Sequence, residues 1–466
     1  MSGSPEGIYE PGVVDPGVPR AKSTQAFWQS EPHPLANHQS PWPTETVDVV
    51  IIGSGVTGTN LARNLLEKRP NLRVVLVEAR TLCSGATGRN GGHIKTMAFA
   101  PWQDRKTTYG IEEAIRLTEF EQSHIDAMIG AAEANGIDCE AVRTEGLDVY
   151  FDPKTFEKAR EDLEDMRIHA PHLANQYTIY TDRNHLQKEF KLSDRAVGAF
   201  GVPACSIWPY KLVTGLIAPL IKSGKLNVQT NTVVKSIKDS PTAESAIVYT
   251  TRGDIKARHV VHATNAWMGH LVPELRPFAS PVRGNVVHYA PNEQQEHTKA
   301  ADKSPFGYEP NYSYWLRYTT HDYDYLIQRS AGDVLVGRAN TARRATGDDT
   351  VTDMSPMSHL RGMAKQVAAS ASSNSNITHA WSGILGFSQD KSPFVGRLPF
   401  PGRSHQWVCG VYHGIGMTKA FRTAEMMALM ILGEDVPEEY PRSMLVTPER
   451  VQLLRESLGY VGKSKL

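Results

Sequence analysis

Hydrophobic residues first concentrate at Val47–Ile52, directly after residues 1–44, which are rich in Pro, Gly and Ser and show little periodicity. Such a run is typical of a strand that is buried on both faces of a parallel sheet. A glycine-rich turn follows, and then come a helical pattern at Asn60–Arg69 and a second apolar strand at Val74–Val77. This order predicts a βαβ unit, preceded by an extended N-terminal arm that Phe27 and Trp28 anchor to the body.

The rest of the chain mixes helical and strand patterns. Helical periodicity is present at Ile111–Ala134 and Thr155–Arg167, and residues 281–338 alternate in the manner of an antiparallel sheet, with a turn at Gly332. The other predicted strands are Leu147–Tyr150, Leu226–Gln229, Ala246–Thr250, Val260–Ala263 and Trp407–Val411, and the last of these leads into a helix at Met417–Leu432.

Nucleotide-binding signals at both ends of the chain, with an antiparallel sheet between them, predict an α/β protein whose domains are discontinuous. We expect a Rossmann-like nucleotide-binding domain from residues 45–100, 195–270 and 375–440. Residues 101–194 and 271–374 should mainly form a second, α+β domain built on the antiparallel sheet, and residues 441–466 should form a C-terminal tail.

The turn after the first strand has the full G-x-G-x-x-G spacing of a dinucleotide-binding site. It reads Gly53-Ser54-Gly55-Val56-Thr57-Gly58, and Glu78 ends the next strand twenty residues later. In such a site the first glycine allows the tight turn, the second lets the backbone approach the pyrophosphate, and the third lets helix and strand pack closely. The acidic residue accepts hydrogen bonds from ribose hydroxyls and disfavours a 2′-phosphate, so NADP is not expected.

Composition narrows the classes of partner. The 466 residues contain 50 Lys plus Arg and 50 Asp plus Glu, so no net charge favours nucleic acid or an anionic membrane surface. The four cysteines lie far apart, without metal-ligand spacing, and no apolar run approaches the roughly 20 residues of a membrane span. We therefore expect a small-molecule partner and no metal.

The C-terminal tripeptide Ser464-Lys465-Leu466 matches a peroxisomal address and predicts a peroxisomal import receptor as a further partner. Without this signal the protein would be cytoplasmic.

Five segments together resemble one enzyme family. They are LCSGATGRNGGH at 82–93, WPYKL at 208–212, VVHATNAW at 260–267, WSGILGFSQDKSPFVG at 381–396 and CGVYHGIGMT at 409–418. The chain resembles FAD-dependent oxidoreductases of the D-amino-acid oxidase type, in the branch of glutamylputrescine oxidase and sarcosine oxidase. The resemblance implies a glutathione-reductase-like FAD-binding domain and flavin-dependent oxidation of an amine.

The fingerprint and the resemblance together give a set of expected FAD contacts. Arg89 is expected to pair with the pyrophosphate or the flavin carbonyls, the Val234 backbone to contact adenine, and the turn at Gly414–Gly416 to direct free N–H groups at the flavin pyrimidine. The complete set is Gly53, Ser54, Gly55, Val56, Thr57, Gly58, Glu78, Ala79, Arg80, Ser84, Gly85, Ala86, Arg89, Asn90, Gly91, Gly92, Val234, Thr264, Asn265, Trp267, Gly386, Asp390, Gly414, Ile415, Gly416 and Met417.

The chain departs from its relatives where they attach flavin covalently. Sarcosine oxidases of this type use a cysteine in the flavin-side loop, and here Gly383–Asp390 contains none. Related dehydrogenases use a histidine where this chain has Arg89. We therefore expect non-covalent FAD, with His93 as the alternative point of attachment.

The expected reaction is hydride transfer from the α-carbon of a small amine or amino acid to FAD, which leaves an imine. A peroxisomal address favours molecular oxygen as acceptor and hydrogen peroxide as product. The alternatives are a flavin dehydrogenase or desaturase of secondary metabolism and a non-catalytic flavin-binding module; a nicotinamide-dependent monooxygenase would need a second nucleotide fold.

Candidate catalytic residues follow from proximity to the flavin motifs and from charge. His93, Tyr412, His413 and Lys419 flank those motifs, and Arg283 and Arg329 are candidates for clamping a substrate carboxylate. The aromatic residues gathered at 312–325 would line a half-buried sheet or hold an amine.

Overall fold

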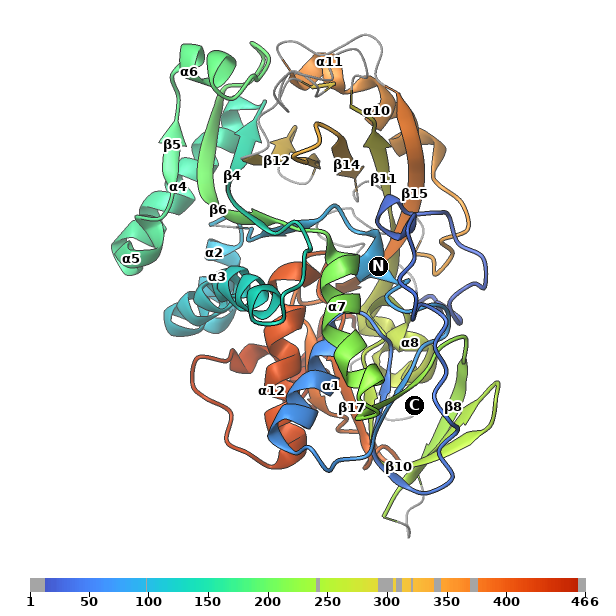
Figure 1. Ribbon diagram of the computed structural model, residues 1–466. Helices are drawn as coiled ribbons and strands as arrows, with labels where there is room; N and C mark the ends of the chain where they lie inside the picture. Colours follow the sequence, from blue (N-terminus) through green and yellow to red (C-terminus); the bar gives the residue numbers. More distant parts are fainter. Residues whose placement is uncertain are drawn as a thin grey trace.

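The computed structural model describes residues 13–97, 99–239, 244–291, 305–306, 312–319, 322–338, 345–368 and 376–459. Two sheets dominate the fold (Figure 1). One sheet forms the lower half of the view with helices against it, and the other lies above it. This arrangement confirms the predicted α/β architecture of a nucleotide-binding part and a second, sheet-based part.

The lower sheet has parallel strands at its centre. Its order is β16-β17-β10-β1-β2-β7, in which β1 pairs in parallel with both β2 and β10, and β8 and β9 extend it as antiparallel strands. The strands are β1 (Val47–Ile52), β2 (Val74–Val77), β7 (Leu226–Gln229), β8 (Val234–Asp239), β9 (Ala246–Thr250), β10 (Asp254–His262), β16 (Phe394–Arg397) and β17 (Gln406–Gly410).

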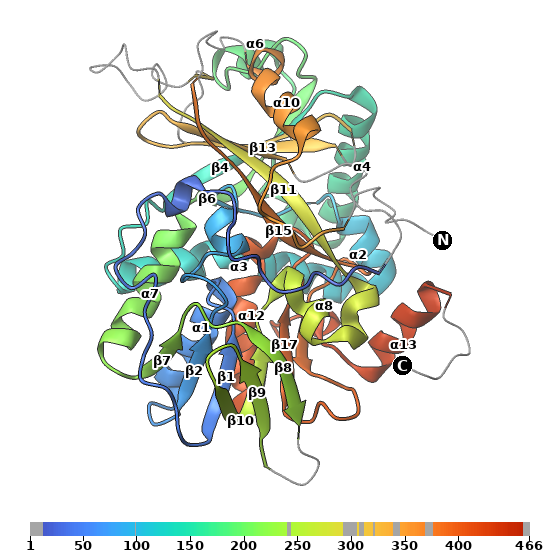
Figure 2. The ribbon, with the colours of Figure 1, turned by 90° about the vertical axis from the view of Figure 1, so that its right-hand side faces the viewer.

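Both faces of this sheet are covered, which explains why β1 and β2 are so apolar. Helices α1 (Val56–Lys68), α7 (Pro209–Lys222) and α12 (Ala420–Leu432) contribute to one core with side chains such as Val49 and Leu76. On the other face, Val50 and Val75 pack against β8 and β9, which cross the sheet in Figure 2. The predicted βαβ unit is therefore confirmed, with the helix beginning at Val56.

The upper sheet is mixed. Its order is β15-β11-β14-β13-β12-β4-β6-β3, with β5 added beside β6, and among the described strands only β12 and β4 pair in parallel. Gly332, with φ +91°, turns the chain between β13 and β14 as predicted. The strands are β3 (His93–Lys95), β4 (Val142–Tyr150), β5 (Thr178–Tyr180), β6 (Gly198–Ser206), β11 (Ala279–Tyr289), β12 (Tyr312–Arg317), β13 (Tyr323–Gln328), β14 (Val334–Arg338) and β15 (Ile377–Ser388).

The remaining helices complete the fold. Helices α4, α6, α10 and α11 surround the upper sheet, and α8 follows the end of β10 (Figures 1 and 2). Their bounds are α2 (Trp102–Tyr109), α3 (Ile111–Ala134), α4 (Pro153–His169), α5 (Pro171–Ala174), α6 (Arg183–Lys188), α8 (Met268–Leu271), α10 (Met354–Gly362), α11 (Ala364–Val367) and α13 (Pro448–Ser457).

The sheets divide the chain differently from the predicted domains. β3, β6 and β15 were expected in the nucleotide-binding domain, but all three are strands of the upper sheet. β15 pairs with β11 along its length, from Ala279–Ser388 to Tyr289–Ile377. Conversely, α3 was expected in the second domain, but its Leu117 and Phe120 belong to the core of the lower sheet. The strands β3, β6 and β15 lie in the upper sheet because their position depends on antiparallel partners far apart in sequence and not on the neighbouring motifs.

The two ends of the chain also pack on the body. Residues 13–44 are mostly without regular structure, as predicted, and Trp28 is buried within a short turn of 3-10 helix, η1 (Phe27–Gln29). The predicted C-terminal tail instead contains α13, whose Val451 and Leu454 join a hydrophobic core. Ser464-Lys465-Leu466 lies outside the described residues.

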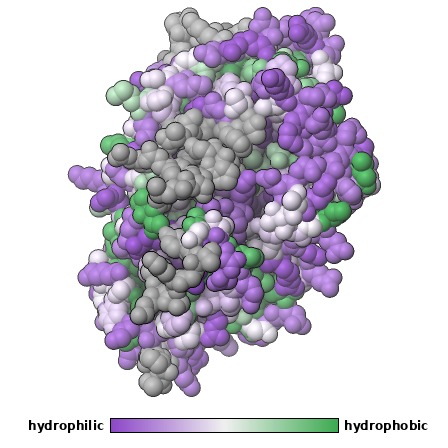
Figure 3. Space-filling view, turned by 180° about the vertical axis from the view of Figure 1, so that it is seen from behind, coloured by the Kyte–Doolittle hydropathy of each residue, from purple (hydrophilic) through white to green (hydrophobic). Residues whose placement is uncertain are grey.

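One face of the molecule carries mainly polar groups. The face seen in Figure 3 is largely hydrophilic, with apolar side chains scattered over it. Within the described ranges, no helix combines the length and apolarity that crossing a membrane requires. The same ranges contain no group of three or more His, Cys, Asp or Glu side chains arranged to hold a metal ion.

Candidate functional site

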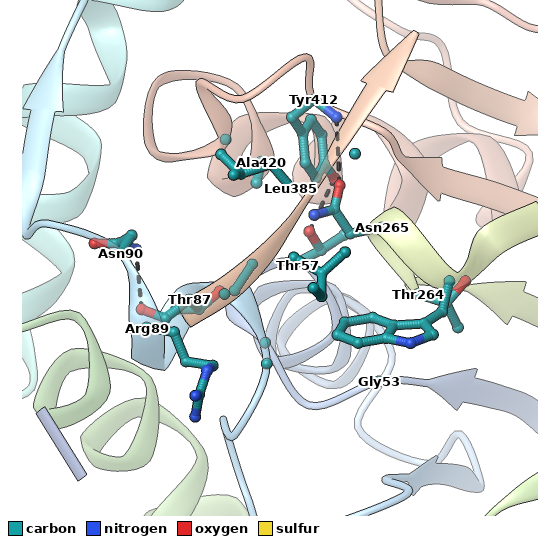
Figure 4. A pocket seen from close by; sticks show the side chains of 18 of the residues that line it. Gly53, Thr57, Thr87, Arg89, Asn90, Thr264, Asn265, Leu385, Tyr412 and Ala420 are labelled. Atoms are coloured by element: carbon teal, nitrogen blue, oxygen red, sulfur yellow. Dashed lines mark hydrogen bonds between the residues drawn. The ribbon is translucent and has the colours of Figure 1, made fainter. Parts of the chain in front are cut away.

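A cavity between the two sheets brings together most of the predicted site (Figure 4). Lower-sheet segments form one end of it and upper-sheet strands form the other. The predicted residues that line it are Gly53, Ser54, Gly55, Val56, Thr57, Glu78, Ala79, Arg80, Gly85, Ala86, Arg89, Asn90, Gly91, His93, Val234, Thr264, Asn265, Trp267, Gly386, Tyr412, Gly414, Ile415, Gly416 and Met417. Those that do not line it are Gly58, Ser84, Gly92, Asp390, Arg283, Arg329, His413 and Lys419.

The three fingerprint glycines serve different purposes. A Cβ on Gly53 would lie 2.6 Å from the Ala263 carbonyl oxygen, and one on Gly58 would overlap the Gly53 carbonyl oxygen, so both permit close backbone packing. Gly55 is the N-cap of α1, and its Cβ would meet only the Thr87 side chain, with Oγ1 at 3.1 Å. The space beside Gly55 is therefore cavity, at the helix end that favours anions.

Glu78 presents a fixed carboxylate at the end of β2. One oxygen accepts hydrogen bonds from the Ser54 N–H (3.0 Å) and Ser54 Oγ (2.7 Å), and the other accepts one from the Arg80 N–H (2.9 Å). Each carboxylate oxygen has two lone pairs, so one oxygen retains acceptor capacity. The residue is buried and lines the cavity, which suits it to ribose hydroxyls.

Arg89 was expected to pair with phosphate or flavin, but its guanidinium is committed to the protein. Nε donates to the Ser382 carbonyl (2.7 Å), and Nη2 donates to the carbonyl of Thr24 in the N-terminal arm (2.6 Å). Burial lowers the pKa of Arg89 to about 10. Arg80 is similarly engaged, since it pairs with buried Asp349 at 2.8 Å. The loop around Arg89 can therefore contact a ligand mainly through its backbone.

Polar atoms without a protein partner test whether the cavity fits a dinucleotide. Thr264 Oγ1 and Trp267 Nε1 are buried and have no hydrogen-bond partner in the described structure, and both residues line the cavity. A Cβ on Gly386 would lie 3.0 Å from Asn265 Oδ1, so this wall has no room for a side chain. Unsatisfied buried donors and acceptors are rare unless a ligand or water satisfies them. The wall therefore fits a polar ligand, and FAD in particular at the fingerprint end.

The turn before α12 is tightly wound. Val411, His413 and Gly414 have φ values of +60°, +54° and +77°. Regular α-helix starts only at Ala420, after a 3-10 turn at Gly416–Thr418, so the helix begins later than predicted. The helix begins later because the residues with left-handed backbone conformation turn the chain sharply beside the cavity.

Tyr412, a catalytic candidate, joins the two helices that flank this turn. Its hydroxyl forms a hydrogen bond with Thr57 Oγ1 in α1 (2.8 Å) and accepts one from Thr423 Oγ1 in α12 (3.3 Å). Burial raises its pKa well above the usual value. The hydroxyl therefore holds the walls together, while the ring lines the cavity.

The neighbouring candidates, His413 and Lys419, do not line the cavity. His413 contacts the Ser388 carbonyl at 3.2 Å. Lys419 is buried with its Nζ 3.6 Å from a carboxylate oxygen of Glu121, which also pairs with Arg105. Burial lowers the pKa of Lys419 to about 8. These contacts make Lys419 part of an ionic cluster behind the start of α12.

His93 lies at the opposite end of the cavity from the fingerprint. Its Nδ1 forms a hydrogen bond with Ser313 Oγ, and its Nε2 is buried without a partner in the described residues. The Tyr325 ring packs edge-on against it, with centroids 5.3 Å apart. Burial lowers the pKa of His93 to about 3, and the Lys95 cation adds to this effect, so the imidazole is neutral at ordinary pH.

Lys95 lines the cavity and belongs to a buried cluster of charges. Its Nζ pairs with Asp148, which also accepts a hydrogen bond from Arg317 Nη2 (3.0 Å). Both cations also contact the Trp315 ring, with Lys95 Nζ 4.8 Å and Arg317 Cζ 4.9 Å from its centroid. Two cations share one carboxylate, which gives the group a formal charge of +1. Burial lowers the pKa of Lys95 to about 8.

Sequence reasoning overlooked Lys95, although a signal was present. His93 and Lys95 are two apart, and in a strand such residues share a face. Recognising β3 directly after the glycine-rich segment would have placed both side chains on the same side. Other lining residues that the predictions did not include come from the arm (Gly17, Val18 and Pro19) and from β15 (Ile384, Leu385).

The two arginines expected to clamp a carboxylate are already neutralised. Arg283 pairs with Asp353 (3.0 Å) and lies 3.6 Å from Asp348. Arg329 pairs with Glu140 (2.7 Å) and Asp333 (2.6 Å). Neither lines the cavity, so the structure corrects this prediction: both stabilise the upper domain.

Comparison with known proteins shows how widely the pattern is shared. The sequence model of the FAD dependent oxidoreductase (DAO) family matches residues 48–430. The probable oxidoreductase OrdL of Rhizobium meliloti is 28% identical over 394 residues, 83% of each chain. Glycine oxidase of Pseudomonas aeruginosa is 26% identical over 394 residues, 83% of this chain and 95% of its own. Gamma-glutamylputrescine oxidoreductase of Escherichia coli is 28% identical over 258 residues, 54% of this chain and 58% of its own.

Solved structures share the fold. Glycine oxidase from Geobacillus kaustophilus superposes with a TM-score of 0.65 at 20% identity, covering 87% of this chain and 99% of its own. L-proline dehydrogenase from P. horikoshii gives a TM-score of 0.66 at 18% identity, covering 89% and 99%. The family match spans most of the sequence, including the fingerprint and the turn before α12. The chain is therefore a member of the FAD dependent oxidoreductase (DAO) family, and FAD is its cofactor.

Proposed function

We propose that the protein oxidises a small amine or amino acid at the carbon that bears the nitrogen. The observation that carries this proposal is the cavity, which runs from the fingerprint at Gly53–Gly58 to a wall of His93, Lys95, Trp315 and Tyr325. It offers cofactor and substrate one continuous enclosure. The names of two relatives, glycine oxidase and gamma-glutamylputrescine oxidoreductase, point to the same class of reaction.

The proposed reaction requires little acid–base catalysis from the protein. Bound FAD supplies a two-electron acceptor for the hydride that leaves the α-carbon. The nitrogen lone pair forms the C=N bond, one N–H proton passes to solvent, and water hydrolyses the imine to a carbonyl compound and an amine or ammonia. The tasks of the chain are to orient the substrate and to exclude bulk water. Neutral His93, whose Nε2 lacks a protein partner, is suited to hydrogen-bond the substrate.

The charge of the substrate wall favours an amine that also carries a carboxylate. Lys95 and Arg317 share Asp148, so a buried net positive charge lies next to the cavity. Burying a charge without a counter-ion is unfavourable, and a substrate carboxylate would balance this one. Lys95 therefore takes the role that the sequence assigned to Arg283 and Arg329. An amino acid fits this wall better than a simple alkylamine.

The electron acceptor and the location of the enzyme rest on separate arguments. We propose oxygen as acceptor, with hydrogen peroxide as product, and FAD held without a covalent bond because no cysteine occurs in Gly383–Asp390. Peroxisomal import stays a prediction from Ser464-Lys465-Leu466.

The test is anaerobic reduction of the bound flavin. Purified holoenzyme is mixed with a panel of amines and amino acids, and the loss of flavin absorbance is followed. We expect bleaching by an amine that carries a carboxylate and slower or no bleaching by its decarboxylated analogue. A flavin that no member of the panel reduces would favour the non-catalytic module. Adding oxygen to the reduced enzyme then separates an oxidase, which reoxidises rapidly, from a dehydrogenase, which does not.

A further inference from the structure

The N-terminal arm lies outside the segment that matches the family, yet it crosses the cavity that the family residues form. In Figure 2 the blue N-terminal chain runs across the middle of the molecule, between the upper sheet and α8. Three consecutive arm residues, Gly17, Val18 and Pro19, line the cavity. The arm is thus part of the wall and not only a covering of the surface.

Anchors on both sides hold these three residues in place. Before them, the Asp15 carboxylate pairs with His270 Nδ1 and Arg276 Nη2, both at 2.9 Å. After them, the Arg20 carbonyl accepts a hydrogen bond from Arg80 Nη1 (3.4 Å). His270 and Arg276 follow β10, whereas Arg80 follows β2, so residues 15–20 bridge two separate segments of the nucleotide-binding part.

A second set of contacts fixes the arm further along. The Thr24 N–H donates to the Asp349 carbonyl (2.9 Å), and Thr24 Oγ1 accepts from the Ser382 N–H (3.0 Å). The Thr24 carbonyl accepts from Arg89 (2.6 Å). Because Asp349 also pairs with Arg80, both sets of anchors meet at the loop that follows β2. Arg89 and Arg80 thereby bind the arm.

The position of the arm identifies which part of the cofactor it covers. Gly17–Pro19 share the cavity with Glu78 at the end of β2, with Thr232–Val234 and with Trp267. The end of the second strand is where dinucleotide-binding folds hold the adenosine ribose. Val18 keeps 37% of its surface exposed although it is apolar and lines the cavity. A bound adenosine would cover part of that surface.

We infer that residues 15–24 form a strap over the adenosine half of FAD and slow its release. The strap therefore contributes contacts to the cofactor site, and these contacts come from outside the segment that matches the family. The inference depends on FAD binding and not on which substrate is oxidised, so it would survive failure of the proposed function. By linkage, FAD must also stabilise the strap, because a ligand that a segment helps to hold favours the ordered state of that segment.

Asp15→Ala tests the first set of anchors. Holoenzyme is diluted and the rise of free-FAD fluorescence gives the dissociation rate. We expect release roughly three- to tenfold faster than in the wild type, since the partly exposed ion pair with Arg276 and the hydrogen bond with His270 are lost. Asp126→Ala is the matched control, because it removes an exposed Asp–Arg pair with Arg143 that lies away from the cavity, and its FAD should leave at the wild-type rate.

Three further measurements keep the test decisive. The double variant Asp15→Ala/Thr24→Val should release FAD faster still, and its melting temperature should fall in the holoenzyme more than in the apoprotein. Trypsin, which cleaves after Arg20 and Lys22, should cut the apoprotein faster than the holoenzyme. The inference is overturned if the double variant keeps the wild-type release rate, if apo- and holoprotein lose stability equally, or if FAD does not protect the arm from trypsin.

Discussion

At the nucleotide end of the cavity, the wall includes consecutive residues of one turn, Gly53–Thr57, together with Glu78 at the end of the adjacent strand. At the substrate end, the wall combines Lys95 from β3, Trp315 from β12 and Tyr325 from β13. The first end works through backbone shape and helix N–H groups, whereas the second works through side chains whose charges depend on one another. Changes at the first end should therefore alter FAD binding, and changes at the second should alter turnover of the substrate.

The largest expected effect is at Gly55. Gly55→Val should give folded protein without FAD, because the new side chain would extend into the cavity beside the N-terminus of α1, where only Thr87 is close. Flavin absorbance and circular dichroism of the purified variant measure the two properties. Gly130→Ala, in α3, has open space around its Cβ and serves as the control. Yellow Gly55→Val protein would contradict the assignment.

At the other end, Lys95→Met should spare FAD and impair the substrate. Asp148 keeps Arg317 as a partner, so the fold retains one ion pair while the net positive charge disappears. For a carboxylate-bearing amine we expect kcat/KM to fall roughly 100-fold, which corresponds to about 2.7 kcal/mol. Steady-state kinetics and the flavin content of the same preparation measure this. Loss of FAD from Lys95→Met would mean that the two ends are not separable.

Glu78→Gln should weaken FAD binding and spare substrate turnover, the opposite of the effect of Lys95→Met. Replacing the charged acceptor of ribose hydroxyls should weaken FAD binding by about 1.5–3 kcal/mol. Titration of apoprotein with FAD measures the loss, and at saturating FAD the variant should oxidise substrate at nearly the wild-type rate. Unchanged affinity would show that Glu78 serves only to hold Ser54 and Arg80.

The pH dependence should report on Lys95. Its pKa is lowered to about 8 by burial, so raising the pH through 8 removes the proton and with it the positive charge. For a carboxylate-bearing substrate, kcat/KM should fall above about pH 8, by up to roughly tenfold per pH unit. Lys95→Met should lack this decrease, although Lys419, with a pKa also lowered to about 8, is intact in that variant. The same decrease in both proteins would assign it to another group.

The smallest expected effect is at Arg329. Arg329→Gln should leave KM within about twofold, because the guanidinium is paired with Glu140 and Asp333 outside the cavity. Steady-state kinetics with the substrate used for Lys95→Met provide the comparison. A large rise in KM would restore Arg329 as the carboxylate clamp.

The contrast between the two ends also explains what could be predicted from the sequence. β1, β2, β7, β9 and α3 have the predicted bounds, because each carries a strong local pattern. The fingerprint is equally local: its glycines, helix and acidic residue lie within 26 residues, from Gly53 to Glu78. The family resemblance then identified FAD correctly.

Features that depend on distant segments were not predictable. The positions of β3, β6 and β15 depend on antiparallel partners, and the partner of β15 is β11, about 100 residues earlier. Lys95 gains its significance only when Asp148 on β4 and Arg317 on β12 meet it. Arg89 was interpreted as an anion-binding residue, but the arm occupies its guanidinium. A charged residue's role depends on partners that local pattern does not reveal.

The central claim is that one cavity holds FAD at the fingerprint end and a carboxylate-bearing amine at the Lys95 end. A crystal structure of the holoenzyme with a non-oxidisable carboxylate analogue of its substrate tests this directly. The account predicts that the adenosine lies between Glu78 and Gly17–Pro19 and that the analogue's carboxylate lies at the wall of Lys95 and Trp315. An analogue bound against Arg283 or Arg329, or a dinucleotide outside the Gly53–Gly58 turn, would contradict it.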